Sequence, residues 1–328
     1  MSYKKLDSED FLVSIDSVTS TVWSDEAPTL TTFFTSSTTS TNDPYYKNVY
    51  KTASTGSVQF AIAYGDKKGS GSANYNDLVP GASPTRTVYG QFRNLVYGDE
   101  ELDFNFGGTT SEFFWALSIE RARYKEKLLP GTLNIKISGS LGKVFELTDN
   151  SVDTPTATFL ECGRVYQLIS GSNGTSYDGG TGYSAESGSY GLFLPDISTI
   201  ILNPLALSGS VPFSRTDDSA GENIEKMFNA ISGSNAASFA INSQETLSSD
   251  YVFIRARNSE FNYSENPSFI SGSTGDVLFP SQINSPQTFV TSVGLYNDVN
   301  ELLAICKLSK PLTKDFTKET LLRVKLDF

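Results

Sequence analysis

The chain has 328 residues, of which 38% are apolar, including 22 Phe and 16 Tyr. This length and composition predict one to three domains with a substantial apolar core. The formal net charge of −12 disfavours nucleic acid as a partner, because phosphate backbones would be repelled. The absence of histidine removes the commonest general base and metal ligand, and with them the Ser-His and Cys-His nucleophile pairs. We therefore expect a folded protein that is not an enzyme and binds no metal or cofactor.

The sequence also gives no sign of export or of a membrane span. The first ten residues have no apolar stretch after Lys4 and Lys5, and a run of about 18 apolar residues, as a membrane helix requires, occurs nowhere. Cys162 and Cys306 are too few to define a disulfide framework or a four-ligand zinc site. We expect both to be small buried apolar residues.

The N-terminal half is predicted to contain mainly strands. Residues 56–65 place Val58, Phe60, Ile62 and Tyr64 on one side at a period of two, which is typical of a strand. The other expected elements are an extended Ser/Thr-rich region at 1–55, a solvated loop at 66–84, ordered structure from 87, a strand at 113–119 for which a helix remains an alternative, a short helix at 121–128 and a half-buried strand at 133–137.

The C-terminal half is predicted to contain one helix and several strands. Ile224, Met227, Phe228 and Ile231 recur at helical spacing, and the preceding residues 219–222 resemble a capping box. The expected strands are 251–255, a hairpin of 288–296 and 301–308 around a turn at 297–300, and a final strand at 322–328.

These elements together predict a mainly β fold of antiparallel sheets, sandwich or barrel-like, with one or two short helices and long loops. The expected divisions of the chain are an extended region at 1–55, a β domain at 56–150, a loop-rich β insertion at 151–215 and a C-terminal β domain at 216–328.

Two kinds of segment resemble chemical sites but fit them poorly. The acidic residues at 99–103 offer carboxylates for calcium or for a glycosidase, yet they lack the glycine and spacing of an EF-hand loop. A solvated turn is the favoured interpretation. The glycine-rich stretches at 69–72 and 139–143 lack the spacing of a phosphate-binding loop, and the segment 171–183 is predicted to be an exposed loop.

One group of residues has the composition of a protein interface. Arg255 and Arg257 are followed closely by Phe261, Tyr263 and Phe269, and arginine and aromatic residues are enriched at interface hot spots. The alternative, weighted about equally, is a strand end with aromatic residues of the core. These five residues are the candidate interaction site.

The C-terminal third resembles a family of known proteins. Residues 261–269, 286–298 and 301–309 resemble virion structural proteins of contractile-tailed phages, particularly the T-even-like phages of marine cyanobacteria. The resemblance extends to residues 121–128 and 314–328. In addition, Gly294 to Asp298 followed by Leu302 to Ala304 is similar to a hairpin of phage tail-collar and fibre-attachment proteins.

The resemblance implies a structural protein of the phage tail, baseplate or neck that is assembled in the host cytoplasm into the virion. Its implied partners are copies of itself, in a homo-oligomer, and other virion proteins, with neither nucleic acid nor membrane. Two alternatives stay open: a head decoration protein, and a carbohydrate-active or receptor-binding β protein of a fibre that would use Asp99, Glu101 and Asp103.

Overall fold

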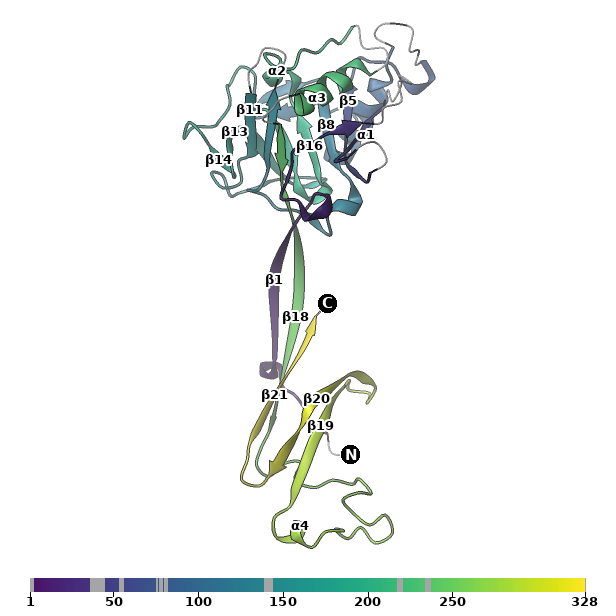
Figure 1. Ribbon diagram of the computed structural model, residues 1–328, viewed down its shortest axis with the longest axis vertical. Coiled ribbons are helices and arrows are strands. Elements are labelled where there is room, and N and C mark those ends of the chain that lie inside the picture. The colour runs from purple at the N-terminus through teal and green to yellow at the C-terminus, as the bar shows by residue number, and fades with distance from the viewer. Residues whose placement is uncertain are drawn as a thin grey trace. The chain divides into compact units, whose positions relative to one another are not determined.

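The computed structural model describes residues 3–35, 45–52, 56–74, 76, 79, 82–138, 144–216, 221–233 and 237–327 (Figure 1). The chain divides into two compact units: a large unit, Ser17–Glu245, and a small unit that combines Met1–Asp16 with Thr246–Phe328. The borders expected near 55, 150 and 215 are not the borders of these units. The reason is that strands from all of the expected divisions pair with one another within the large unit.

The large unit is built on one curled antiparallel sheet that forms half a barrel, which confirms the predicted fold class. Its strand order is β2-β17-β10-β11-β13-β15-β16-β8-β5-β4-β3, and β12 and β14 also pair with β13. In chain order the strands are β2 (Thr29–Leu30), β3 (Phe34–Thr35), β4 (Lys47–Tyr50), β5 (Val58–Asp66), β8 (Phe113–Ile119), β10 (Asn134–Ser138), β11 (Val144–Asp149), β12 (Thr158–Leu160), β13 (Gly163–Ser172), β14 (Thr175–Ser176), β15 (Gly191–Leu194), β16 (Thr199–Leu202) and β17 (Ser238–Ala240).

Side chains that alternate along the central strands fill a core on each face of this sheet. In β8, Trp115 and Leu117 enter the first core, whereas Phe114 and Ala116 enter the second. Every residue of β8 from Phe113 to Leu117 is therefore buried. This double burial explains the aromatic density that left a helix open as an alternative for residues 113–119, because a strand covered on both faces has no polar side.

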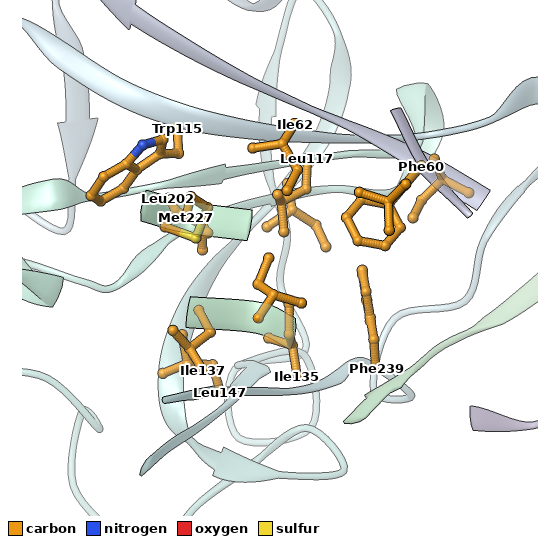
Figure 2. Packing of buried hydrophobic residues seen from close by; sticks show 14 of the residues in the cluster. Phe60, Ile62, Trp115, Leu117, Ile135, Ile137, Leu147, Leu202, Met227 and Phe239 are labelled. Atoms are coloured by element: carbon orange, nitrogen blue, oxygen red, sulfur yellow. The ribbon is translucent and has the colours of Figure 1, made fainter. Parts of the chain in front are cut away.

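The curl of the sheet encloses the first core. Figure 2 shows Ile135 and Ile137 of β10 facing Ile62 of β5 and Leu117 across this core. The rings of Phe60 on β5 and Phe239 on β17 lie 5.4 Å apart, although these strands are distant in the strand order. Helix α3 (Glu222–Ser232) adds Ile224, Met227, Phe228 and Ile231 to the core, as their spacing predicted. The expected capping serine, Ser219, lies outside the described residues.

Helix α1 (Thr85–Tyr97) covers the second core together with the hairpin β6 (Phe104–Phe106) and β7 (Thr109–Ser111). The sequence indicated only that ordered structure resumes near residue 87. Val88 and Tyr89 belong to residue types with modest helix propensity and Gly90 to one with poor propensity, which hides the helix from a propensity argument. It ends at Gly98, whose φ of 63° favours glycine.

Two smaller expectations are corrected by the structure. The helix expected at 121–128 is wrong: a single 3₁₀ turn, η4 (Arg121–Arg123), is followed by a short strand, β9 (Lys127–Leu128), which pairs with β18 (Asn242–Ala256). Both cysteines are free, but only Cys162 is buried as expected, whereas Cys306 is half-buried. Burial raises the pKa of the Cys162 thiol to about 11.

The small unit contains longer strands around little core. The sheet order β1-β18-β21 joins β1 (Phe11–Thr21), β18 and β21 (Thr320–Asp327), and a separate hairpin is formed by β19 (Gln287–Tyr296) and β20 (Leu302–Asp315). The hairpin, its turn and the last strand were predicted, although Phe328 lies outside the described residues. The remaining short elements of the chain are η1 (Ser8–Asp10), η2 (Ser24–Glu26), η3 (Ser72–Asn74), η5 (Pro195–Ile197), α2 (Pro204–Leu207) and α4 (Ser281–Asn284).

A charged cluster of Arg215, Asp66 and Glu112 links the segment after α2 to the central strands of the large unit. The Arg215 guanidinium donates two hydrogen bonds of 2.7 Å to the carboxylate of Asp66, which is buried at the end of β5. It also lies 3.3 Å from Glu112 and stacks on the Phe113 ring, 4.5 Å from the centroid. Two-point pairing of this kind fixes the position of the arginine and satisfies the buried carboxylate.

Replacement of this arginine tests the cluster. Arg215→Met leaves the Asp66 carboxylate buried without its cation, so the free energy of unfolding of the large unit should fall by about 3 kcal/mol. Lys125→Met is the matched control, because it removes an exposed partner of Glu245 and should cost less than about 1 kcal/mol. Denaturant unfolding followed by tryptophan fluorescence measures both values, since Trp23 and Trp115 are buried in this unit. Equal losses in the two variants would contradict the assignment.

Candidate assembly surface

The small unit leaves about half of its described large apolar side chains exposed. Among its described residues, only Val252, Ala256 and Val324 are buried apolar residues, whereas the large unit holds two extensive cores. The exposed large apolar residues of the small unit are Tyr3, Phe11, Leu12, Val13, Ile15, Tyr263, Leu278, Phe279, Ile283, Phe289, Tyr296, Val299, Leu302, Leu303, Ile305, Phe316 and Leu321. Exposure on this scale in a monomer is typical of a binding surface.

Strand β1 contributes the most exposed part of this surface. Phe11, Val13 and Ile15 alternate with Leu12 along the strand, so that three side chains point to one face and one to the other. All four are more than half exposed, from 51% for Phe11 to 71% for Ile15. Neither face of this part of β1 is therefore covered by the chain itself.

The hairpin β19–β20 contributes a second apolar part. Tyr296 pairs with Leu302, and Gly294 pairs with Ile305, so these side chains share one face of the ribbon. The Tyr296 ring lies over Gly294, where a Cβ atom would approach the ring to 2.9 Å. The glycine thus lets the tyrosine fold onto the strand, and the resulting apolar face, with Ile305 59% exposed, remains open to solvent.

Unpaired strand edges accompany the apolar side chains. In the described part of the small unit, β1 and β21 are the outer strands of their sheet, and β19 and β20 pair only with each other. The backbone N–H and C=O groups along such edges are free to pair with a further strand. The surface therefore offers both apolar contact and backbone hydrogen bonds to a neighbouring protein.

A buried lysine holds the loop that carries the candidate aromatic residues. Lys314 of β20 is 0% exposed, and its ammonium donates to the carbonyls of Asn258 and Asp315 and to Oδ1 of Asn262 at 2.9–3.0 Å. Thr288, directly across the hairpin from Lys314, donates to the Phe261 carbonyl. These bonds satisfy a buried charge and anchor the segment after β18 to the hairpin.

The candidate interaction residues lie in this unit but do not form a single cluster. Tyr263 and Phe269 pack edge to face, with ring centroids 5.8 Å apart, and Tyr263 is exposed. Phe261 is half-buried and has a φ of 58°. Arg255 is exposed and bonded to Glu319 through two nitrogens, and the side chain of Arg257 is exposed.

Neither of these two arginines stacks on an aromatic ring among the described residues. Cations of β21 do so instead, since Arg323 and Lys325 lie over the ring of Tyr251. The candidate residues from the sequence thus all lie in the small unit, but the sequence did not indicate the exposed apolar side chains of β1, β19 and β20. The apolar run at 11–15 was the available signal, and the Ser/Thr-rich composition around it concealed that signal.

The acidic residues near 100 have structural partners in the large unit. Asp99 accepts hydrogen bonds from the backbone N–H groups of Glu101 and Leu102, which lower the pKa of its carboxyl. Asp103 accepts from Lys67 and from the hydroxyl of Tyr89. This arrangement fits the turn that was favoured for residues 99–103.

Part of the loop expected at 171–183 is paired, because β13 continues to Ser172 and meets β14. The stretch 139–143 lies outside the described residues.

The described residues contain no group of three His, Cys, Asp or Glu side chains placed to hold a metal ion. Of the helices in the same part of the chain, none has the length and apolar character needed to cross a membrane.

The lysine anchor can be tested by substitution. Lys314→Met leaves the buried Oδ1 of Asn262 without its donor and removes one of the two donors to each of the Asn258 and Asp315 carbonyls, which should loosen the segment 257–263 by about 1–3 kcal/mol. Amide hydrogen exchange of that segment should accelerate by roughly 10- to 100-fold, since about 1.4 kcal/mol corresponds to a factor of ten. Lys310→Met, at an exposed position of the same strand, is the control and should leave the exchange unchanged. An unchanged rate in Lys314→Met would show that the ammonium does not anchor the loop.

Acid should weaken the small unit through its surface ion pairs. The hydrogen bond from Lys4 lowers the pKa of Glu260 below its ordinary value of 4.5, and the hydrogen bond from Arg255 does the same to Glu319. A carboxyl with a lowered folded-state pKa adds stability above the unfolded pKa and loses it as the pH falls through the lowered value.

We therefore expect the small unit to unfold more readily below pH 4.5, seen as a far-ultraviolet dichroism transition without a change in tryptophan fluorescence. Glu260→Gln should reduce this pH dependence, and Asp298→Asn in the exposed hairpin turn should preserve it. A small unit whose stability is constant between pH 6 and 3 would refute the expectation.

The fold and the sequence were compared with known proteins. No protein-family model, no curated protein and no solved structure matches the chain. The functional assignment therefore rests on the geometry of the small unit and on the resemblance of the C-terminal third.

Proposed function

We propose that the chain is a structural protein of a contractile-tailed phage virion, in the tail, baseplate or neck, and that it acts by assembling with other proteins through the small unit. The observation that carries the proposal is the uncovered apolar surface of β1 and of the β19–β20 hairpin. A single chain gains nothing from exposing these side chains, whereas a chain that is packed among neighbours buries them.

The position of the sequence resemblance supports the same unit. Residues 261–269, 286–298 and 301–309, on which the resemblance to phage virion proteins is strongest, all belong to the small unit. They include the hairpin and the loop that Lys314 anchors. The familiar sequence thus includes the exposed apolar hairpin β19–β20, although not β1.

The available apolar free energy is of the same order as the cost of association. Covering a side chain that is already half-buried returns roughly 1 kcal/mol, half of the value for complete burial. Ten such side chains supply on the order of 10 kcal/mol, which is comparable with the 4–15 kcal/mol that association costs. Hydrogen bonds along the unpaired edges would add to this.

The carbohydrate-active alternative finds less support in the geometry. Asp99 and Asp103 are engaged by backbone N–H groups, a lysine and a tyrosine, as a structural turn requires. Both tryptophans are buried, so neither offers a face on which a sugar ring could stack. A head decoration protein would present the same kind of surface, and the fractionation below distinguishes it.

Association with the virion is the direct test. The chain should be present in phage particles purified through a density gradient, at a constant ratio to the major tail protein, and should follow tails when heads and tails are separated. Quantitative mass spectrometry of each fraction measures this, with an abundant host protein as the control for contamination. Recovery with empty heads would favour the decoration alternative, and absence from the particles would end the proposal.

A further inference from the structure

The first described residues of the chain connect the β19–β20 hairpin with the loop after β18. The ring of Tyr3 packs edge to face against the ring of Tyr296, at the end of β19, with centroids 5.3 Å apart. The ammonium of the next residue, Lys4, donates a hydrogen bond of 2.8 Å to the carboxylate of Glu260. Residues 3–5 thus contact two separate elements of the small unit, and we name these residues the strap.

The strap covers one end of the apolar face of the hairpin. Tyr296 is 39% exposed, which makes it the least exposed of the large apolar residues that the hairpin and its turn present to solvent. On the same face of the ribbon, Leu302 is 52% and Ile305 is 59% exposed. A neighbouring protein that packs on the end of this face therefore has to displace the ring of Tyr3.

Only side chains hold the strap in place. Within the described residues, no backbone N–H or C=O group of residues 3–5 forms a hydrogen bond to another backbone group. One surface ion pair and one ring contact together favour the closed strap by only about 10-fold, so roughly one molecule in ten has an open strap. Strands β18 and β21, by contrast, are paired continuously from Ser249 to Ala256. The strap can therefore open while this sheet stays folded.

We propose that the strap is an autoinhibitory cover of the hairpin face, which a neighbouring protein displaces in order to bind there. The inference rests on the proposed function and adds a regulation of its surface. If roughly one molecule in ten is open, the strap weakens binding at this face by about 10-fold, because only the open form is competent to bind. Contacts that are too weak to displace the ring of Tyr3 are thereby rejected.

Reciprocal chemical labelling of the full-length protein tests whether the two contacts act together. Tyr3→Ala removes the ring contact, so acetylation of Lys4 by acetic anhydride should accelerate by about 2- to 10-fold. Lys4→Met removes the ion pair, so nitration of Tyr296 by tetranitromethane should accelerate by about 2- to 5-fold. Lys5→Met, at the exposed next position of the strap, is the matched control and should change neither rate. Peptide mass spectrometry measures both reactions.

Hydrogen exchange distinguishes opening of the strap from unfolding of the small unit. Amide exchange of β18 and β21 should be the same in the wild-type protein and in all three variants. Faster exchange of these strands in Tyr3→Ala or Lys4→Met overturns the proposal, because the first residues would then be part of the folded sheet unit. A variant that loses one contact and leaves the reaction rate at the other unchanged also overturns it, because the two contacts would be independent.

Labelling of purified particles tests the displacement itself. In particles, Tyr296 should be protected from nitration by the neighbouring protein, and Lys4 should react as fast as Lys5 because the strap is open. A Lys4 that is as protected in particles as in the free protein overturns the displacement and leaves the virion assignment intact. A chain that is absent from particles ends the virion assignment, and the labelling of the free protein then decides on the strap by itself.

Discussion

The fold depends on burying apolar side chains away from water. A single chain does this extensively in the large unit but hardly at all in the small unit. In the large unit, alternate side chains of β8 enter two cores, and the curl of the sheet with helices α1 and α3 closes both. The same alternation occurs in β1, where nothing in the small unit covers Val13 or Leu12. Any partner that binds only the folded small unit would therefore stabilise that unit.

Hydrogen-bonded cations take over part of the role that an apolar core would have. Lys314 bonds three oxygens inside the small unit, and Arg215 bonds Asp66 in the large unit. Such groups contribute little net stability compared with apolar packing, but they tolerate few alternative arrangements, because their displacement would leave Oδ1 of Asn262 and Oδ2 of Asp66 buried without a donor. They position the loop after β18 and the segment after α2, respectively. The candidate assembly surface is consequently displayed on a defined backbone despite a small core.

The sequence predicted the elements whose apolar residues follow one clear period. Strands β5, β10 and β21, the β19–β20 hairpin and helix α3 were all recognisable in this way. Helix α1 was hidden by Gly90 and β-branched residues, and the segment 121–128 has helical composition but lies where Lys127 and Leu128 pair with β18. Tertiary pairing overrode local propensity there. For the candidate surface, periodicity shows which side chains share a face of β1 or β20. It does not show whether another part of the chain covers that face, and so the exposure of Ile15 and Ile305 required the structure.

The small unit is discontinuous in sequence, since the large unit is inserted between Asp16 and Thr246. During translation at about 5–20 residues per second, the first strand therefore waits roughly 10–50 s before β18 leaves the ribosome. Nearly all of the large unit has been synthesised by then, and it can fold independently of the small unit. Phe11, Val13 and Ile15 spend that interval as an apolar segment of the nascent chain without their partner strand β18. Chains made side by side on one messenger would carry these segments close together, so the order of synthesis sets how long uncovered apolar segments of neighbouring chains are exposed to one another.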